Sequence, residues 1–195
     1  MPQDEEEWDE FDALGAPPAA PPEGWTLDNL PPDLPEHVEL IRGTLVVSLQ
    51  KAWHLLTVRM FEYGLVEQAP EQFFVFREMA VKENQRSAPQ PDLSIIHAAA
   101  LDEHKSIYLP RDFVLAGEVV SPGSETRDRI EKPVIYADMG IATYWLIERG
   151  ERGVPTVHEH RLIGGTYRLV KTHIDRLVTE VPFPIDIPLA NPARR

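Results

Sequence analysis

Two acidic residues within apolar segments constrain this chain more than any other feature of its sequence. Asp92 lies in the segment 91–96 (PDLSII), and Glu118 lies near the end of the segment 113–121 (FVLAGEVVS). Segments of this kind are typical of strands that are buried on both faces. A buried carboxylate is unfavourable unless something neutralises it. Two of them, on segments that could pair as neighbouring strands, therefore indicate a bound divalent cation.

The size and composition of the chain are those of an ordinary globular protein. Its 195 residues, 43% hydrophobic and 26% charged, are enough for one well-buried core. No apolar stretch approaches the ~20 residues that span a bilayer, and the acidic N-terminus is unlike a signal peptide. The absence of cysteine excludes disulfides and thiolate metal sites. We expect a cytoplasmic protein without a membrane segment.

The net charge of the chain argues against a simple nucleic-acid binder. It is −13 overall, and the first twelve residues hold seven acids and no base, which leaves −6 for the remainder. Proteins that bind nucleic acid usually present a basic face to the phosphates. A metal site itself requires clustered acids, however, and a basic strip can be local. The charge weakens a DNA interpretation without excluding it.

Residues 1–24 differ in composition from the rest of the chain. An acidic run is followed by the segment 16–22 (APPAAPP), and neither can bury much apolar surface. We predict a disordered acidic, Pro-rich tail at 1–24 and one folded domain at 25–195. Trp8 and Phe11 could make the tail a short docking motif for a basic protein partner or a DNA-mimicking arm. The alternative is a tail that only increases solubility.

Hydrophobic patterns in the first half of the domain predict a hairpin, a helix and a strand. Residues 38–41 and 44–47 flank Arg42-Gly43, a tight-turn pair. Residues 51–67 have helical spacing, with one face formed by Ala52, Leu55, Leu56, Met60 and Tyr63. Residues 73–82 are predicted to form a single strand, and a Pro-containing loop then leads to Asp92.

The second half adds further strands and a short helix. Tyr136 lies in a helix that Gly140 ends, and residues 143–147 (TYWLI) predict a buried strand. Residues 156–160 and 166–171 flank Gly164-Gly165 as a second hairpin. The pattern is that of an α+β protein (α/β/α-like). We expect a mixed central β-sheet flanked by helices, with hairpins towards both ends of the domain.

The two acids and a nearby lysine form a constellation suited to phosphodiester hydrolysis. Mg²⁺ and Mn²⁺ prefer oxygen ligands and keep several waters, so one or two carboxylates suffice. Asp92 and Glu118 are candidate ligands, and Glu39 in the first hairpin could complete the cluster. Lys132, in the polar segment after Glu118, could orient a water or stabilise charge on the phosphate.

These motifs together resemble a known family. The segment 117–132 (GEVVSPGSETRDRIEK), followed by Tyr136, resembles the signature of the bacterial putative restriction endonuclease family. That family, formerly a domain of unknown function, belongs to the PD-(D/E)xK nuclease superfamily. Further matches are residues 39–43 (ELIRG), His54, the Pro91-Asp92 pair and residues 144–147 (YWLI). The ordered set spans roughly residues 36–190, although no single match is specific.

The resemblance implies a restriction-endonuclease-like core with a Mg²⁺ or Mn²⁺ site. Asp92 and Glu118 would be metal ligands, with Lys132 as the catalytic cation. The usual lysine two residues after the strand acid is replaced here by Val120, so its role passes to Lys132 on the next helix. Because proline is tolerated at the first helical position, Pro133 predicts that this helix begins near Lys132. Accessory roles are predicted for His54, Asp128 and Tyr136.

Each candidate also has a purely structural interpretation. Asp92 could cap a Pro-Asp turn, Glu118 could pair with a buried arginine, and Lys132 could pair with Asp128 along the helix. Glu39 could be solvated, and His54 could be a core histidine. The sequence His158-Glu159-His160 has metal-binding residue types, but a solvated strand of a hairpin explains it equally well.

The most concrete prediction is a metal-dependent endonuclease that hydrolyses phosphodiester bonds in DNA. By analogy with relatives we expect a homodimer, because two active sites would cut both strands. Two alternatives stay open, since fold does not establish function. One is a nuclease-fold binding or regulatory module that no longer cleaves. The other is a phosphoesterase acting on RNA or small nucleotides, which suits an acidic surface better.

Overall fold

The computed structural model describes residues 20–32, 34, 38–48 and 50–193. Most of the predicted acidic tail, with Trp8 and Phe11, lies outside the described residues. Near the predicted start of the domain, Trp25 is buried and its backbone N–H donates to the carbonyl of Gly43 at 2.8 Å. No helix among the described residues is long and apolar enough to cross a membrane.

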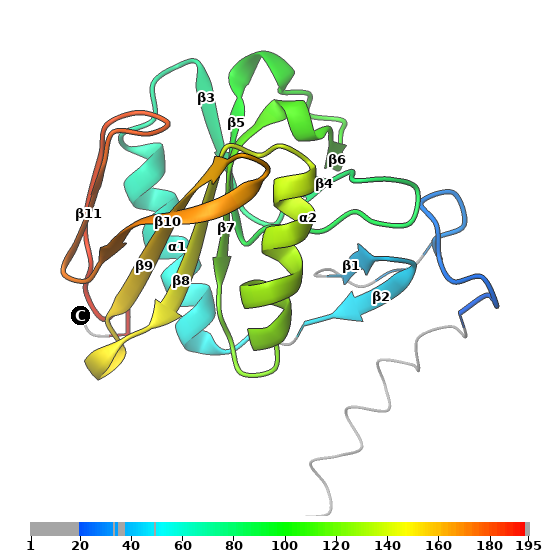
Figure 1. Ribbon diagram of the computed structural model, residues 1–195, viewed down its shortest axis with the longest axis horizontal. Coiled ribbons are helices and arrows are strands. Elements are labelled where there is room, and N and C mark those ends of the chain that lie inside the picture. Colours follow the sequence, from blue (N-terminus) through cyan, green and yellow to red (C-terminus); the bar gives the residue numbers. More distant parts are fainter. Residues whose placement is uncertain (1–19, 33, 35–37, 49, 194–195) are drawn as a thin grey trace, which may run out of the picture.

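A six-stranded mixed sheet forms the centre of the molecule (Figure 1). Its strand order is β10-β9-β8-β7-β5-β3, and all neighbours are antiparallel except β7 and β8. The strands are β3 (Phe73–Phe76), β5 (Leu93–His97), β7 (Phe113–Val119), β8 (Thr143–Arg149), β9 (Pro155–Ile163) and β10 (Thr166–His173). Helices α1 (Ala52–Val66) and α2 (Lys132–Asp138) cover opposite faces. The predicted α+β architecture is confirmed.

Alternation along β7 explains why its acidic residue, Glu118, faces α2. Successive strand side chains point to opposite faces of the sheet. Leu115 and Val119 pack in the core cluster that contains α1, whereas Ala116 packs in the cluster that contains α2. Glu118 lies two residues after Ala116, so its side chain is on the same face of the sheet and projects towards α2, away from the core cluster that contains α1.

Smaller paired strands extend this core. The predicted hairpin forms from β1 (Val38–Ile41) and β2 (Thr44–Val47), with positive φ at both Arg42 (49°) and Gly43 (83°), as a two-residue hairpin turn requires. A second hairpin pairs β11 (Arg176–Thr179) with β12 (Ile185–Pro188), and β4 (Ala80–Val81) pairs in parallel with β6 (Ile107–Tyr108). Short 3-10 turns occur at Ala98–Ala100, Pro110–Asp112 and Glu151–Gly153.

Two predictions about local structure were wrong. Helix α1 forms, but it buries Trp53, His54, Thr57, Val58, Phe61 and Leu65. On the apolar face predicted from spacing, Leu55 and Tyr63 are 47% and 62% exposed, whereas Met60 is partly buried against the core. The single strand predicted for residues 73–82 is divided into β3 and β4, because Glu78 adopts a positive φ of 53° that interrupts an extended chain.

Helix α2 begins at Lys132 as predicted, but it continues helical backbone that begins before it. Helical backbone extends through Thr126 and a π-helical segment, Arg127–Glu131, before α2 starts at Lys132. A proline inside an α-helix clashes with the carbonyl four residues earlier. The wider π turn before Pro133 relieves that clash, so helical backbone can precede Lys132. Lys132 is therefore within a continuous helical segment.

Candidate active site

The pairing of β5 with β7 brings Asp92 and Glu118 to the same end of the sheet. The strands are antiparallel, and Leu93 lies opposite Gly117. Asp92 precedes β5 and Glu118 lies near the end of β7, so this register places the two acids next to each other. The backbone N–H of Val119 donates to Oδ2 of Asp92 at 2.7 Å. The expected neighbouring strands are confirmed.

Glu118 is fully buried and both of its carboxylate oxygens are engaged. The hydroxyl of Tyr136 donates to Oε1 at 2.6 Å, and Nζ of Lys132 lies 3.0 Å from Oε2. Burial raises the pKa of Glu118 well above its ordinary value, Lys132 opposes this, and Asp92 adds to it. The carboxylate thus lies where a cation or a proton is needed.

Lys132 is the cation at the centre of this cluster. Its Nζ lies 3.0 Å from Oε2 of Glu39 as well as from Glu118, and 3.9 Å from Oδ1 of Asp128. Burial lowers the pKa of Lys132, but these three carboxylates outweigh it and raise the pKa overall. The ammonium group therefore stays charged at neutral pH. Besides Asp128, the partner considered from sequence, it contacts Glu39 and Glu118.

The cluster holds more negative charge than one lysine can balance. Burial raises the pKa of Asp128 from 3.8 to about 6, while Lys132 and a hydrogen bond from the Ser124 hydroxyl act in the opposite direction. Four carboxylates, Glu39, Asp92, Glu118 and Asp128, are buried around this one ammonium group. An excess of buried acids is costly to folding, which makes this cluster the candidate functional site.

His54 connects helix α1 to the cluster. Its side chain is buried, and Nε2 lies 3.0 Å from Oδ2 of Asp92. Nδ1 is buried as well and has no hydrogen-bond partner among the described residues. His54 is therefore a buried histidine that contacts a carboxylate of the candidate site.

A small cavity of about 10 Å³ adjoins these groups, room for roughly one water molecule. Its lining includes residues that the sequence prediction missed, namely Ser48, Gln50, Ser121, Ser124 and Arg127. Oε1 of Gln50 is buried without a partner among the described residues. Gln50 lies between β2 and α1 and belongs to none of the motifs found in the sequence, so no sequence signal pointed to it.

The donor set of the site fits a hard divalent cation. In the described part of the chain, no three acidic or histidine side chains are grouped closely enough to hold a metal ion by themselves. Nζ of Lys132 lies between Glu39 and Glu118 instead. Mg²⁺ and Mn²⁺ keep several waters, however, so Asp92 and Glu118 with the unpartnered oxygen of Gln50 offer suitable ligands.

The structure does not bring His158, Glu159 and His160 together as a site. Neighbouring strand residues point to opposite faces, so Glu159 is separated from both histidines. His158 lies 3.0 Å from Glu148, whereas Glu159 lies 2.8 Å from His173. The segment therefore forms separate structural contacts, although Glu159 is buried and not solvated as the sequence interpretation supposed.

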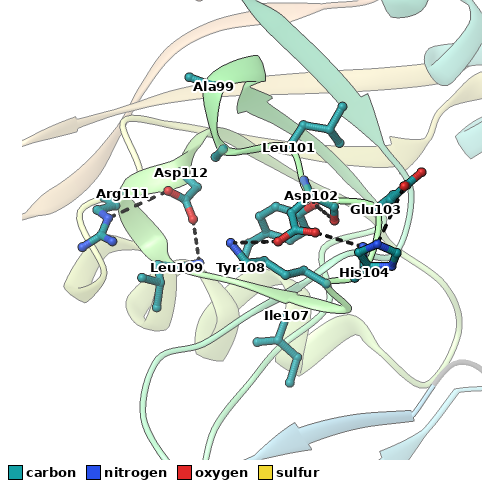
Figure 2. Close-up of a pocket in the computed structure, with 12 residues that line it drawn as sticks. Ala99, Leu101, Asp102, Glu103, His104, Ile107, Tyr108, Leu109, Arg111 and Asp112 are labelled. Atoms are coloured by element: carbon teal, nitrogen blue, oxygen red, sulfur yellow. Dashed lines mark hydrogen bonds and ion pairs between the residues drawn. The ribbon is translucent and has the colours of Figure 1, made fainter.

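A hollow of about 930 Å³ is lined by residues between 99 and 112 and lies outside the carboxylate cluster (Figure 2). Its charged side chains pair with their own neighbours, such as Lys105 with Asp102 and Arg111 with Asp112. The hydroxyl of Tyr108 donates to the carbonyl of Asp102. No buried, unbalanced charge of the described chain faces this hollow, so we do not regard it as the active site.

The fold and the paired strand acids define a restriction-endonuclease-like protein. The chain belongs to the Uma2 family, described as "Putative restriction endonuclease", whose model matches residues 26–190. Among solved structures it is similar to a putative nuclease belonging to DUF820 from Anabaena variabilis ATCC 29413. The two share 19% sequence identity with a TM-score of 0.61, over 80% of this chain and 89% of that one. At this identity the likeness shows the fold. No curated protein matches the chain.

Proposed function

We propose that this protein is a Mg²⁺- or Mn²⁺-dependent endonuclease that hydrolyses phosphodiester bonds in DNA. The observation that carries the proposal is the convergence of Asp92, Glu118 and Lys132 at one end of the sheet. Membership of a family described as restriction endonucleases supports the same reaction class. The buried excess of acids gives the site a cation requirement that a purely structural cluster would not have.

Asp92 and Glu118 are the proposed metal ligands. A bound divalent ion would activate a water molecule and offset negative charge on the phosphate. Asp92 is held by the N–H of Val119 and by His54, and Glu118 is held by the hydroxyl of Tyr136. His54 and Tyr136 are therefore positioning residues, because they fix the orientation of the two carboxylates.

Lys132 supplies a permanent positive charge next to these ligands. Because its neighbours raise its pKa, it acts as a cation and not as a proton donor at neutral pH. An ammonium group placed near a phosphate stabilises the charge that develops in the transition state. Glu39 and Asp128 hold this group in the site, so we assign them to positioning Lys132. Glu39, in the first hairpin, is also proposed as a third metal ligand.

A cleavage assay with matched variants tests the proposal. Supercoiled plasmid and labelled oligonucleotides are incubated with the protein and Mg²⁺, Mn²⁺ or EDTA. We expect metal-dependent cleavage that Asp92→Asn and Glu118→Gln abolish. The control variant Asp102→Asn removes an acid in the outer loop and should cleave at the normal rate.

Calorimetric titration of Mn²⁺ separates the alternatives. Binding by the parent chain and its loss in folded Asp92→Asn and Glu118→Gln would support the metal site. Metal binding without cleavage of any substrate would favour a regulatory module. Turnover only on RNA, single strands or small nucleotides would favour the phosphoesterase alternative. Cleavage that persists in EDTA, or in both variants, would contradict the proposal.

A further inference from the structure

A second cavity adjoins the carboxylate cluster and has the opposite electrostatic character. Its volume is about 360 Å³, and it shares His54 and Ser121 with the small cavity beside Asp92 and Glu118. The remaining lining comes from the start of α1, the segment after β7 and the end of β8. These residues are Lys51, Trp53, Val120, Pro122, Glu125, Arg129, Glu148 and Arg149. A group bound in this cavity would therefore lie next to the proposed catalytic centre.

The N-terminus of α1 forms one wall of this cavity. The first backbone N–H groups of a helix have no partner within the helix, and they carry a partial positive charge. In α1 no side chain caps these groups, and the first turn contains no acidic residue. The residue at the cap position is Lys51, which adds a full positive charge to the same place. This is the arrangement that favours a phosphate group.

His54 gives a second and independent indication of a ligand. The residue is 2% exposed, it lines the cavity, and its Nδ1 has no hydrogen-bond partner among the described residues. A buried polar atom without a partner is unfavourable unless a ligand or water satisfies it. Nε2 is already engaged by Asp92, so the imidazole links the two cavities.

The charged side chains of the cavity leave a net positive contribution. Arg129 is paired with Glu148 at 2.6 Å, which neutralises that acid. Among the described residues, neither Lys51 nor Arg149 forms an ion pair, and the Arg149 guanidinium lies over the Trp53 ring at 5.6 Å. Glu125 is the remaining acid and is exposed to solvent. On a strongly acidic chain, this is a local basic strip beside the candidate active site.

We propose that this cavity binds the phosphate group that neighbours the scissile phosphodiester in a nucleic-acid strand. The free N–H groups of α1, Lys51 and Arg149 contact this phosphate, next to the unpartnered Nδ1 of His54. The inference rests on the proposed function, because a flanking phosphate exists only in a strand. It explains how an acidic protein holds a polyanion next to four carboxylates.

Binding measurements in a non-cleaving background test this inference. The Glu118→Gln chain is titrated into a fluorescently labelled oligonucleotide, and anisotropy gives the affinity at several salt concentrations. Lys51→Gln and Arg149→Gln should each weaken binding about threefold and reduce the slope of log K against log salt by ~0.7–0.9. The controls Lys105→Gln and Arg111→Gln, which remove cations from the hollow of Figure 2, should bind normally.

Amide chemical shifts provide a readout that does not depend on cleavage. A short oligonucleotide titrated into ¹⁵N-labelled Glu118→Gln protein should shift the N–H signals of Ala52, Trp53 and His54. Lys51→Gln should reduce these shifts, and inorganic phosphate should produce a smaller version of them. Shifts confined to other parts of the chain would overturn the proposed phosphate site.

The outcomes separate failure of this site from failure of the proposed function. If the parent chain cleaves DNA while Lys51→Gln and Arg149→Gln bind like the controls, the cavity is wrong and the function stands. If the parent chain binds the oligonucleotide without cleaving it, and only these two variants bind more weakly, the phosphate site is supported and the nuclease function is contradicted. A folded parent chain that neither binds nor cleaves nucleic acid would overturn both.

Discussion

Two clusters of buried charged side chains differ in how far their acids are balanced by basic or hydrogen-bonding partners. Around Lys132, four carboxylates share one ammonium group, and the pKa of Glu118 is raised. Around Glu159, one carboxylate receives hydrogen bonds from Thr179 at 2.7 Å and His173 at 2.8 Å, and Arg161 lies 2.5 Å away. Although burial raises the pKa of Glu159, these partners lower it overall. Balanced charge fits a structural role, whereas unbalanced charge fits a binding site.

The largest expected difference between the clusters concerns the reaction. Lys132→Gln should slow DNA cleavage by about 10²–10³-fold, because a preorganised cation is lost where negative charge develops. The matched change Arg161→Gln, in the Glu159 cluster, should leave the cleavage rate of the folded protein unchanged. Initial rates on one oligonucleotide at saturating metal measure both. Equal rates for Lys132→Gln and the parent chain would show that the Lys132 cluster has no more role in cleavage than the Glu159 cluster.

Unfolding free energies should change in opposite directions in the two clusters. Glu159→Gln leaves Arg161 and His173 without their shared acid and should cost ~3–4 kcal/mol. Glu118→Gln relieves repulsion and desolvation of an excess acid, so it should stabilise the protein by ~1 kcal/mol, a stability–function trade-off. Urea unfolding monitored by tryptophan fluorescence at neutral pH gives both values. A large loss of stability in Glu118→Gln would mean that this acid is mainly structural.

The clusters should also respond oppositely to pH. The folded-state pKa of Asp128 is raised from 3.8 to about 6, so the folded protein binds more protons and loses stability as pH rises through this interval. This loss is ~2–3 kcal/mol. The pKa of Glu159 is lowered from 4.5, so its stabilisation is present above that value and disappears as pH falls further.

Thermal or urea unfolding between pH 3 and pH 7 can isolate these two contributions. Asp128→Asn should remove the loss of stability between about pH 4 and pH 6. Glu159→Gln should instead flatten the acid side of the profile. Identical pH profiles for the Asp128→Asn variant and the parent chain would contradict the raised pKa of that carboxyl.

The smallest expected effects come from the hydroxyl donors of the two clusters. Tyr136→Phe removes the hydrogen bond to Glu118, and Thr179→Val removes one to Glu159, at ~1 kcal/mol of stability each. Only Tyr136→Phe should also change Mn²⁺ affinity, because it frees the orientation of a proposed ligand. Calorimetry on both variants checks this. Equal metal affinity in Tyr136→Phe and the parent would leave that hydroxyl with a purely structural role.

The fold was largely predictable because strand signals in this chain are strong. The apolar segments around Asp92 and Glu118 allow few environments other than buried strands, and the structure pairs them. The face of α1 was not predictable in the same way. Both sides of that helix carry apolar residues, so the choice between Leu55 and Phe61 depends on tertiary packing. The β11–β12 hairpin was missed although its strands alternate buried and exposed residues.

The site was predictable in its residue types but not in its balance of charge. The strand pattern and the polar segment after Glu118 selected Asp92, Glu118 and Lys132, the family resemblance supported them, and the structure places them together. Sequence spacing could not show that Lys132 contacts Glu39, which lies far earlier in the chain. It also could not show the π-helical segment, since Pro133 is compatible with either a helix start or a widened turn. Contacts over long sequence separations exist only once the chain is folded.

The location of the lysine on a helix has a consequence for recognising distant relatives. In a strand-borne motif the lysine must keep a fixed interval from the acid. Here it reaches Glu118 from the helical turns that follow Arg127–Glu131, and Val120 is free to be buried instead. Insertions or deletions between strand and helix can therefore be absorbed without losing the amine. Searches that allow variable spacing and require a helical lysine should find homologues that a rigid pattern omits.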